Sequence, residues 1–140
     1  METPSALELK NTDKILDLLV EIEGISYKNL REDIFEITGP EGATCILDVE
    51  ETLVCIGAEI CAIPEENTPE DTQDIIKLFR VLLELNNEAI HGKFAIIDGK
   101  IFFKENLEIE NIDGNELEAA LAWTLLMVIK GVEKISGIIE

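Results

Sequence analysis

The sequence has a single histidine, three cysteines and few aromatic residues, and these scarcities limit the chemistry that it can perform. His91 lies in a polar segment, residues 86–92, and any Ser–His or Cys–His catalytic pair would depend on it alone. Cys45, Cys55 and Cys61 match no metal or redox spacing, so we interpret them as buried thiols in a reducing cytoplasm. No G-x-S-x-G, Walker or G-x-G-x-x-G pattern occurs. We therefore predict no catalytic residue, no metal site and no cofactor.

Basic residues are scarce as well: 11 stand against 30 acidic residues, which gives a net charge of −19. Such a field repels nucleic-acid phosphates and anionic lipid surfaces, and it attracts a basic partner. The alternative is that the acidic residues only confer solubility on a chain in which 46% of the residues are hydrophobic. The charge predicts a protein partner of basic character and no nucleic acid.

The chain also lacks a leader signal and a long hydrophobic run. Its first residues, METPSALELK, contain no basic region followed by an apolar run, so we predict no signal peptide. The longest apolar block, residues 119–129, would span about 16 Å as a helix, roughly half a bilayer core. We expect a cytoplasmic protein without membrane association.

One calcium motif requires a test, because residues 111–115 carry side-chain oxygens at alternate positions. An EF-hand loop counted from Asn111 requires glycine at its sixth position and glutamate at its twelfth, where this chain has Glu116 and Ala122. We interpret Asp113 as a helix cap instead. An enzyme with an unconventional carboxylate-based site stays open as an alternative function.

The first half of the chain predicts one helix and three strands after a loose leader, residues 1–11. Thr12 is expected to cap a helix over residues 13–23, and Gly24 is expected to end it. The expected strands cover residues 34–38, 43–49 and 52–63. The third of them has apolar residues on both faces, so we expect a central strand that is covered on both sides.

In the second half, the segment TPED (68–71) predicts the start of a helix that runs to about residue 87, with a hydroxyl cap and a proline. The dipeptide DG (98–99) indicates a type I′ hairpin turn. We expect the segment LEIE (107–110) to form an acidic edge strand and Asp113 to cap a last helix. The predicted order is α-β-β-β-α-β-β-(β)-α. This order describes one α+β domain over residues 1–140, with helices packed on an antiparallel sheet.

The second and last helices carry more apolar surface than a single stripe requires. The apolar positions of the second helix cover about 220° of arc, and Leu78, Val81 and Leu85 form one flank. Trp123 and Met127 lie on a separate side of the last helix. We predict that these five residues form a dimer or partner surface. The alternative is that the sheet and neighbouring helices cover them within one subunit.

Residues 81–128 resemble the second half of YbjN-type domains and of the CesT-like chaperones of type III secretion. The shared features are a helix ending in LLELN (82–86), the DG turn, the LEIE segment and a capped terminal helix that begins at Asp113. The detailed match covers about a third of the chain, and the rest agrees in the order of its elements.

The resemblance implies a type III secretion chaperone-like fold, a homodimer that binds protein segments, and no catalytic residue. We therefore expect a non-enzymatic, acidic protein-binding domain with a chaperone-like or regulatory function. The alternatives are the carboxylate-based enzyme and a purely structural assembly subunit.

Overall fold

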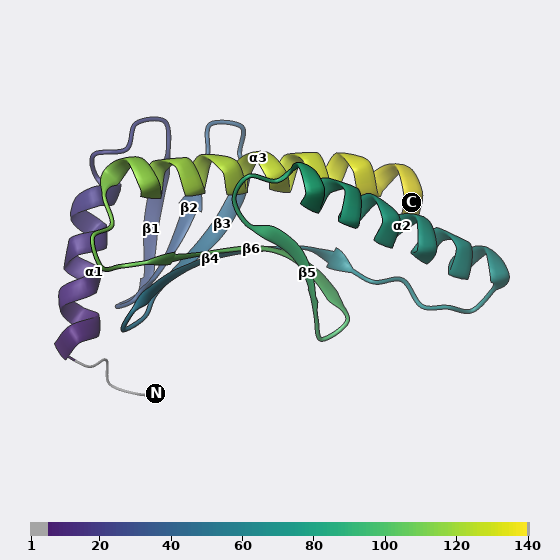
Figure 1. Ribbon diagram of the computed structural model, residues 1–140, viewed down its shortest axis with the longest axis horizontal. Coiled ribbons are helices and arrows are strands. Elements are labelled where there is room, and N and C mark those ends of the chain that lie inside the picture. Colours follow the sequence, from purple (N-terminus) through teal and green to yellow (C-terminus); the bar gives the residue numbers. More distant parts are fainter. Residues whose placement is uncertain (1–5, 140) are drawn as a thin grey trace.

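The computed structural model describes residues 6–139, which form a six-stranded antiparallel sheet and three helices. In chain order the elements are α1 (Ala6–Leu19), β1 (Ser26–Arg31), β2 (Ile34–Thr38), β3 (Thr44–Val49), β4 (Leu53–Ala62), α2 (Pro69–Glu88), β5 (Lys93–Ile97), β6 (Lys100–Glu108) and α3 (Gly114–Ile139). Helix α3 runs along the length of the molecule, with α1 at one end and α2 beside it at the other (Figure 1). The α+β class and the antiparallel sheet are as the sequence predicts.

The strands of the sheet follow the order β1-β2-β3-β4-β6-β5, and every neighbouring pair is antiparallel. Strand β4 is central, as expected, because β3 and β6 pair with its two sides. Its alternate residues Val54, Ile56 and Ala58 are buried beneath the helices, whereas Cys55 and Gly57 on the opposite face are half-buried. The expectation that β4 is covered on both faces is therefore wrong for a single subunit, because the helices cover only one face of the sheet.

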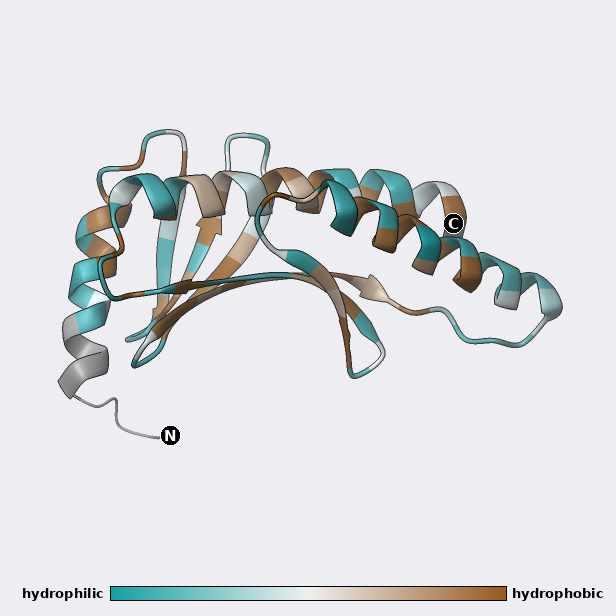
Figure 2. Ribbon diagram, viewed as in Figure 1, coloured by the Kyte–Doolittle hydropathy of each residue, from teal (hydrophilic) through white to brown (hydrophobic). Residues whose placement is uncertain are grey.

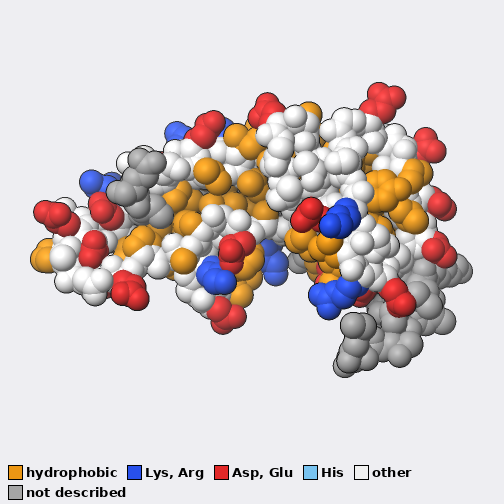
Figure 3. Space-filling model, turned by 180° about the vertical axis from the view of Figure 1, so that it is seen from behind, with side chains coloured by type: hydrophobic (Ala, Val, Ile, Leu, Met, Phe, Trp, Pro, Cys, Tyr) orange, Lys and Arg blue, Asp and Glu red, His pale blue; other side chains and the backbone are white. Residues whose placement is uncertain are grey.

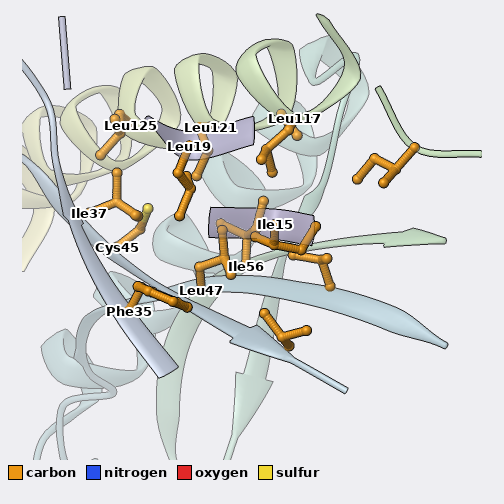
Figure 4. Close-up of a cluster of buried hydrophobic side chains, with 14 of the residues drawn as sticks. Ile15, Leu19, Phe35, Ile37, Cys45, Leu47, Ile56, Leu117, Leu121 and Leu125 are labelled. Carbon is orange, nitrogen blue, oxygen red and sulfur yellow. The ribbon is translucent and has the colours of Figure 1, made fainter. Parts of the chain in front are cut away.

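Helix α3 takes part in two separate hydrophobic cores. In the first, Leu117, Leu121 and Leu125 of α3 meet α1 and the strands β2, β3 and β4 (Figure 4). In the second, Met127 and Ile135 of α3 meet α2, β5 and β6. Colouring by hydropathy shows brown, hydrophobic bands on the helices and on the strands that they cover (Figure 2). One helix therefore closes both halves of the molecule.

The caps and turns that the sequence indicates are present. Thr68 accepts a hydrogen bond from the backbone N–H of Asp71, and the Asp71 carboxylate accepts one from the backbone N–H of Thr68. Asp98 and Gly99 have φ angles of 50° and 75°, as a type I′ turn requires. The Asp113 carboxylate accepts a hydrogen bond from the backbone N–H of Glu116 at 2.8 Å. Short-range signals thus determine where α2 and α3 begin and where the chain turns between β5 and β6.

The first helix begins earlier than the sequence suggested. Helix α1 starts at Ala6, so Thr12 lies inside it and is not its cap. The segment ALELK (6–10) consists of strong helix formers, which extend the helix towards the N-terminus. The leader predicted over residues 1–11 is therefore wrong for residues 6–11, and residues 1–5 lie outside the described part of the chain.

Two strand assignments also change. Residues 26–38 form a hairpin, β1 and β2, where one strand was expected. All six side chains of β1 are exposed, so no alternation of polar and apolar residues marks it in the sequence. Leu107 and Glu108 are the last residues of β6, so the first half of the LEIE segment continues that strand and does not form a separate one. These two residues pair with β4, whereas β5 pairs only with residues 100–104 of β6, so this end of β6 is an edge of the sheet, as expected.

The side chain of Asn86 fixes the outer edge of β5. Its amide oxygen accepts a hydrogen bond from the backbone N–H of Phe94 at 2.6 Å, and its amide nitrogen donates one to the Phe94 carbonyl at 3.2 Å. The amide thereby takes the place of a neighbouring strand at Phe94. The two outermost strands of the sheet therefore differ. Strand β5 is hydrogen-bonded at Phe94 to a side chain of α2, whereas all the side chains of β1 are exposed.

Candidate functional site

The single histidine of the chain lies close to one carboxylate. His91 Nδ1 lies 3.7 Å from Glu105 Oε2, and this pair lies beside the loop between α2 and β5. No group of three or more histidine, cysteine, aspartate or glutamate side chains converges within the described residues as a metal site would require. The calcium-like residues 111–115 serve as a turn and as the cap of α3, where Asn111 has a φ of 64°.

The three cysteines are free thiols with raised pKa values. Burial raises the pKa of Cys45 from 9.0 to about 12. Burial raises the pKa of Cys55 too, and the nearby Glu50 and Asp48 carboxylates add to the effect. For Cys61, burial and then the Glu59 carboxylate raise the pKa. Since the thiolate is the reactive form, none of these thiols is activated as a nucleophile at neutral pH.

Several exposed apolar side chains lie on α2. Ile76, Phe79 and Leu83 occupy one line along this helix and are 55%, 36% and 70% exposed. We call these three residues the α2 ridge. The ridge borders a hollow of about 310 Å³ between α2 and β5, which Ile96 also lines. Apolar side chains that stand together in this way are typical of surfaces that pack against another protein.

The five residues predicted to form the dimer or partner surface lie on the opposite, inward side. Leu78, Leu85 and Met127 are at most 3% exposed and belong to the second core, while Val81 and Trp123 are half-buried against it. Their assignment to a surface is corrected accordingly, because within one subunit these residues of α2 and α3 pack against each other and against β5 and β6. The unusually wide apolar arc of α2 is nevertheless divided between two environments: one flank is in the core, and the α2 ridge faces outward.

A second apolar hollow lies at the other end of the molecule, between α3, the loop from α1 to β1 and the turn from β2 to β3. Its volume is about 290 Å³. Leu121, Leu125 and Leu126 of α3 form one side, and Ile22 and Ile25 lie across from them. No pattern in the sequence indicates this hollow directly, because its sides come from three segments that are far apart along the chain.

The charge of the protein is mostly uncompensated. Since there are 30 acidic and 11 basic residues, at least 19 carboxylates have no basic side chain of their own. Acidic side chains are spread around patches of hydrophobic side chains on the face shown in Figure 3. Apolar surface and negative charge therefore occur side by side on this face.

No helix among residues 6–139 combines the length and the apolar character that a membrane crossing requires.

Comparison with known proteins places this geometry in a family context. The family model CesT_Tir_1 matches residues 8–136. No curated protein matches the chain in sequence.

Solved structures show the same fold at low sequence identity. A chain of the heterodimeric ExoU–SpcU complex from the type III secretion system of Pseudomonas aeruginosa is 14% identical, with a TM-score of 0.59, and the match covers 76% of this chain and 86% of that one. An uncharacterised protein from Methanothermobacter thermautotrophicus is 11% identical, with a TM-score of 0.65 and coverage of 91% and 97%. A chain of the ExsC–ExsE complex is 16% identical, with a TM-score of 0.57 and coverage of 87% and 93%. These likenesses establish the fold.

Proposed function

The chain belongs to the CesT/Tir chaperone family, and we propose from this premise that it is a non-enzymatic protein-binding domain, chaperone-like or regulatory, that acts in the cytoplasm as a homodimer. The 140 residues would serve as a single interaction module. Two of the similar structures are chains of complexes, ExoU–SpcU and ExsC–ExsE, and this supports a protein as the partner. The negative charge favours a partner with basic segments.

The exposed apolar side chains of the α2 ridge are the observation that supports a homodimer. Its three large apolar side chains project from a helix whose other flank is already packed in the second core. A single helical row of this kind can pack against its own copy about a two-fold axis, since both partners then offer the same surface. Ile96 of β5, which is 52% exposed, extends the apolar surface beside the ridge.

Light scattering coupled to size-exclusion chromatography tests the homodimer. One chain has a mass of 15.6 kDa, so the dimer is expected at about 31 kDa, twice that value. Leu83→Glu places a charge on the ridge and should give a monomer. Val20→Glu is the matched control, because Val20 is also exposed, at 56%, but lies beside α1 and off the ridge.

A monomeric wild type, or equal masses for the two variants, would contradict the dimer through α2. The two alternatives make different predictions in the same experiments. A structural assembly subunit would form a fixed oligomer that binds no further protein. A carboxylate-based enzyme would turn over a substrate without needing the ridge.

A further inference from the structure

The exposed apolar residues of α2 and of the loop after it are spaced symmetrically around Leu83. Leu83 is the most exposed residue of the α2 ridge, at 70%, and Ile76 lies seven residues before it, at 55% exposure. Ile90, in the loop that follows α2, lies seven residues after it and is 76% exposed. An antiparallel copy of this segment centred on Leu83 would therefore bring Ile76 of each copy towards Ile90 of the other.

The outer side of α2 also has a surface that a second helix can fill. A shallow hollow of about 750 Å³ lies along it, and every residue that lines this hollow belongs to α2. The three ridge residues, Arg80 and Glu84 are among them. Grooves between the side chains of a single helix are where the side chains of another helix pack. Helix α2 extends past the edge of the sheet, which leaves room for such a helix (Figure 1).

Two opposite charges, Arg80 and Glu84, border the ridge. Counted round the helix from Leu83, they lie at about 60° and about 100° on the same side. The ion pairs among the described residues involve neither of them, although the two are four residues apart on one helix. Arg80 is also one of only two arginines in a chain with 30 acidic residues. A scarce cation and a carboxylate are thus both available at the border of the apolar surface.

Antiparallel pairing would satisfy both charges at once. A two-fold axis perpendicular to α2 turns the Arg80 side of one copy towards the same side of the second. With the axis at Leu83, Arg80 of one copy and Glu84 of the other lie about 3 Å apart along the helix direction, within reach of their side chains. Symmetry gives this pair twice. A parallel arrangement would instead place arginine against arginine and glutamate against glutamate, which is unfavourable.

Charges at the contact matter because the chain as a whole repels its own copy. A net charge of −19 on each subunit opposes association. Repulsion between exposed charges is largely screened beyond about 10 Å at 0.1 M salt, whereas charges that meet at a contact are screened much less. A surface of this chain that pairs with itself therefore needs complementary charges at its own border, and α2 has them.

We propose that α2 binds α2 of a second copy in antiparallel orientation about an axis at Leu83, and that the Arg80–Glu84 pairs select this partner and this orientation. The inference rests on the proposed homodimer and adds which residues make the pairing specific. The apolar ridge supplies the contact area, and the two ion pairs disfavour helices with another charge pattern.

Sedimentation equilibrium of charge-reversal variants tests the pairing. Arg80→Glu places two carboxylates against each other on both sides of the axis, so the dissociation constant of the dimer should rise about tenfold or more. Arg31→Glu is the matched control, because Arg31 is the other arginine and is exposed on β1, at the opposite edge of the sheet from β5. It changes the net charge equally, and its dimer should be as stable as that of the wild type.

The reciprocal change, Glu84→Arg, should weaken the dimer in the same way, with Glu118→Arg at an exposed glutamate of α3 as its control. Both changes in one chain restore opposite charges across the axis, so the double variant should dimerise as the wild type does. The two single variants, mixed in equal amounts, should form a heterodimer in native mass spectrometry, because each offers the charge that the other lacks. Circular dichroism should show every variant folded.

Equal dissociation constants for Arg80→Glu and Arg31→Glu would overturn the pairing of Arg80 with Glu84. A double variant that dimerises no better than the single ones would overturn it too, as would mixed single variants that form no heterodimer. In each of these cases a dimer that Leu83→Glu still disrupts would support the proposed homodimer, so the two failures are distinguishable. A monomeric wild type would overturn both.

Discussion

Replacing Asn86 by alanine should destabilise the protein markedly. The change removes both hydrogen bonds to Phe94, at 2.6 Å and 3.2 Å, in a part-buried site. Each such bond contributes about 0.5–1.5 kcal/mol net, and the Phe94 N–H and carbonyl also lose their partner when only one side is removed. We expect a loss of about 2–3 kcal/mol in the free energy of unfolding, which is a large share of the stability of a small domain.

Urea unfolding followed by circular dichroism measures this loss, with Asn87→Ala as the matched control. Asn87 is the exposed neighbour on the same helix, so the control carries the same change in helix propensity. Asn86→Asp adds a second test, because a carboxylate can still accept from the Phe94 N–H but repels the Phe94 carbonyl. It should be less stable than wild type at neutral pH. Equal stability of Asn86→Ala and Asn87→Ala would refute the argument that the amide holds β5.

Three further predictions concern the interior. Thr124 is fully buried and its hydroxyl has no hydrogen-bond partner among the described residues, so Thr124→Val should raise the unfolding free energy by about 1 kcal/mol in urea titrations. A side chain at Gly92 would lie 2.6 Å from the Phe103 ring at a φ of 75°, so Gly92→Ala should lower the melting temperature far more than Gly42→Ala, which shares a positive φ but has open space. Cys45 ionises near pH 9 when unfolded but only at about 12 when folded, so the stability that its neutral thiol contributes is complete below pH 9 and is lost as the pH rises towards 12. Cys45→Ala should abolish this part of the alkaline dependence, and an unchanged profile would contradict it.

The parts of the fold that could be predicted from the sequence are those set by neighbouring residues. The TPED segment places a hydroxyl, a proline and a carboxylate where the first turn of a helix needs them, whatever the helix packs against. The DG dipeptide likewise supplies two residues that tolerate positive φ. Such signals do not depend on distant contacts, and the structure reproduces them.

The inward face of α2 could not be predicted, because it depends on contacts with distant segments. Apolar residues occupy most of its circumference, so no polar boundary separates the flank of Leu78 and Leu85 from the α2 ridge. Two sets of contacts determine which flank of α2 faces inward. Asn86 hydrogen-bonds to Phe94 of β5, and the inward flank packs against residues of α3. The hollow between α3 and the turn from β2 to β3 was missed for a similar reason, since Leu125, Ile22 and Gly39 become neighbours only in the folded chain.

The position of α3 in the chain has a consequence for synthesis on the ribosome. Neither core is complete until the 26 residues of α3 are present, although every strand of the sheet precedes them. At about 5–20 residues per second, the sheet emerges with its inner face uncovered, and α3 follows over about 1–5 s. During that interval the nascent chain exposes hydrophobic residues that the finished protein hides, and this is the kind of surface that makes incompletely folded chains prone to aggregate.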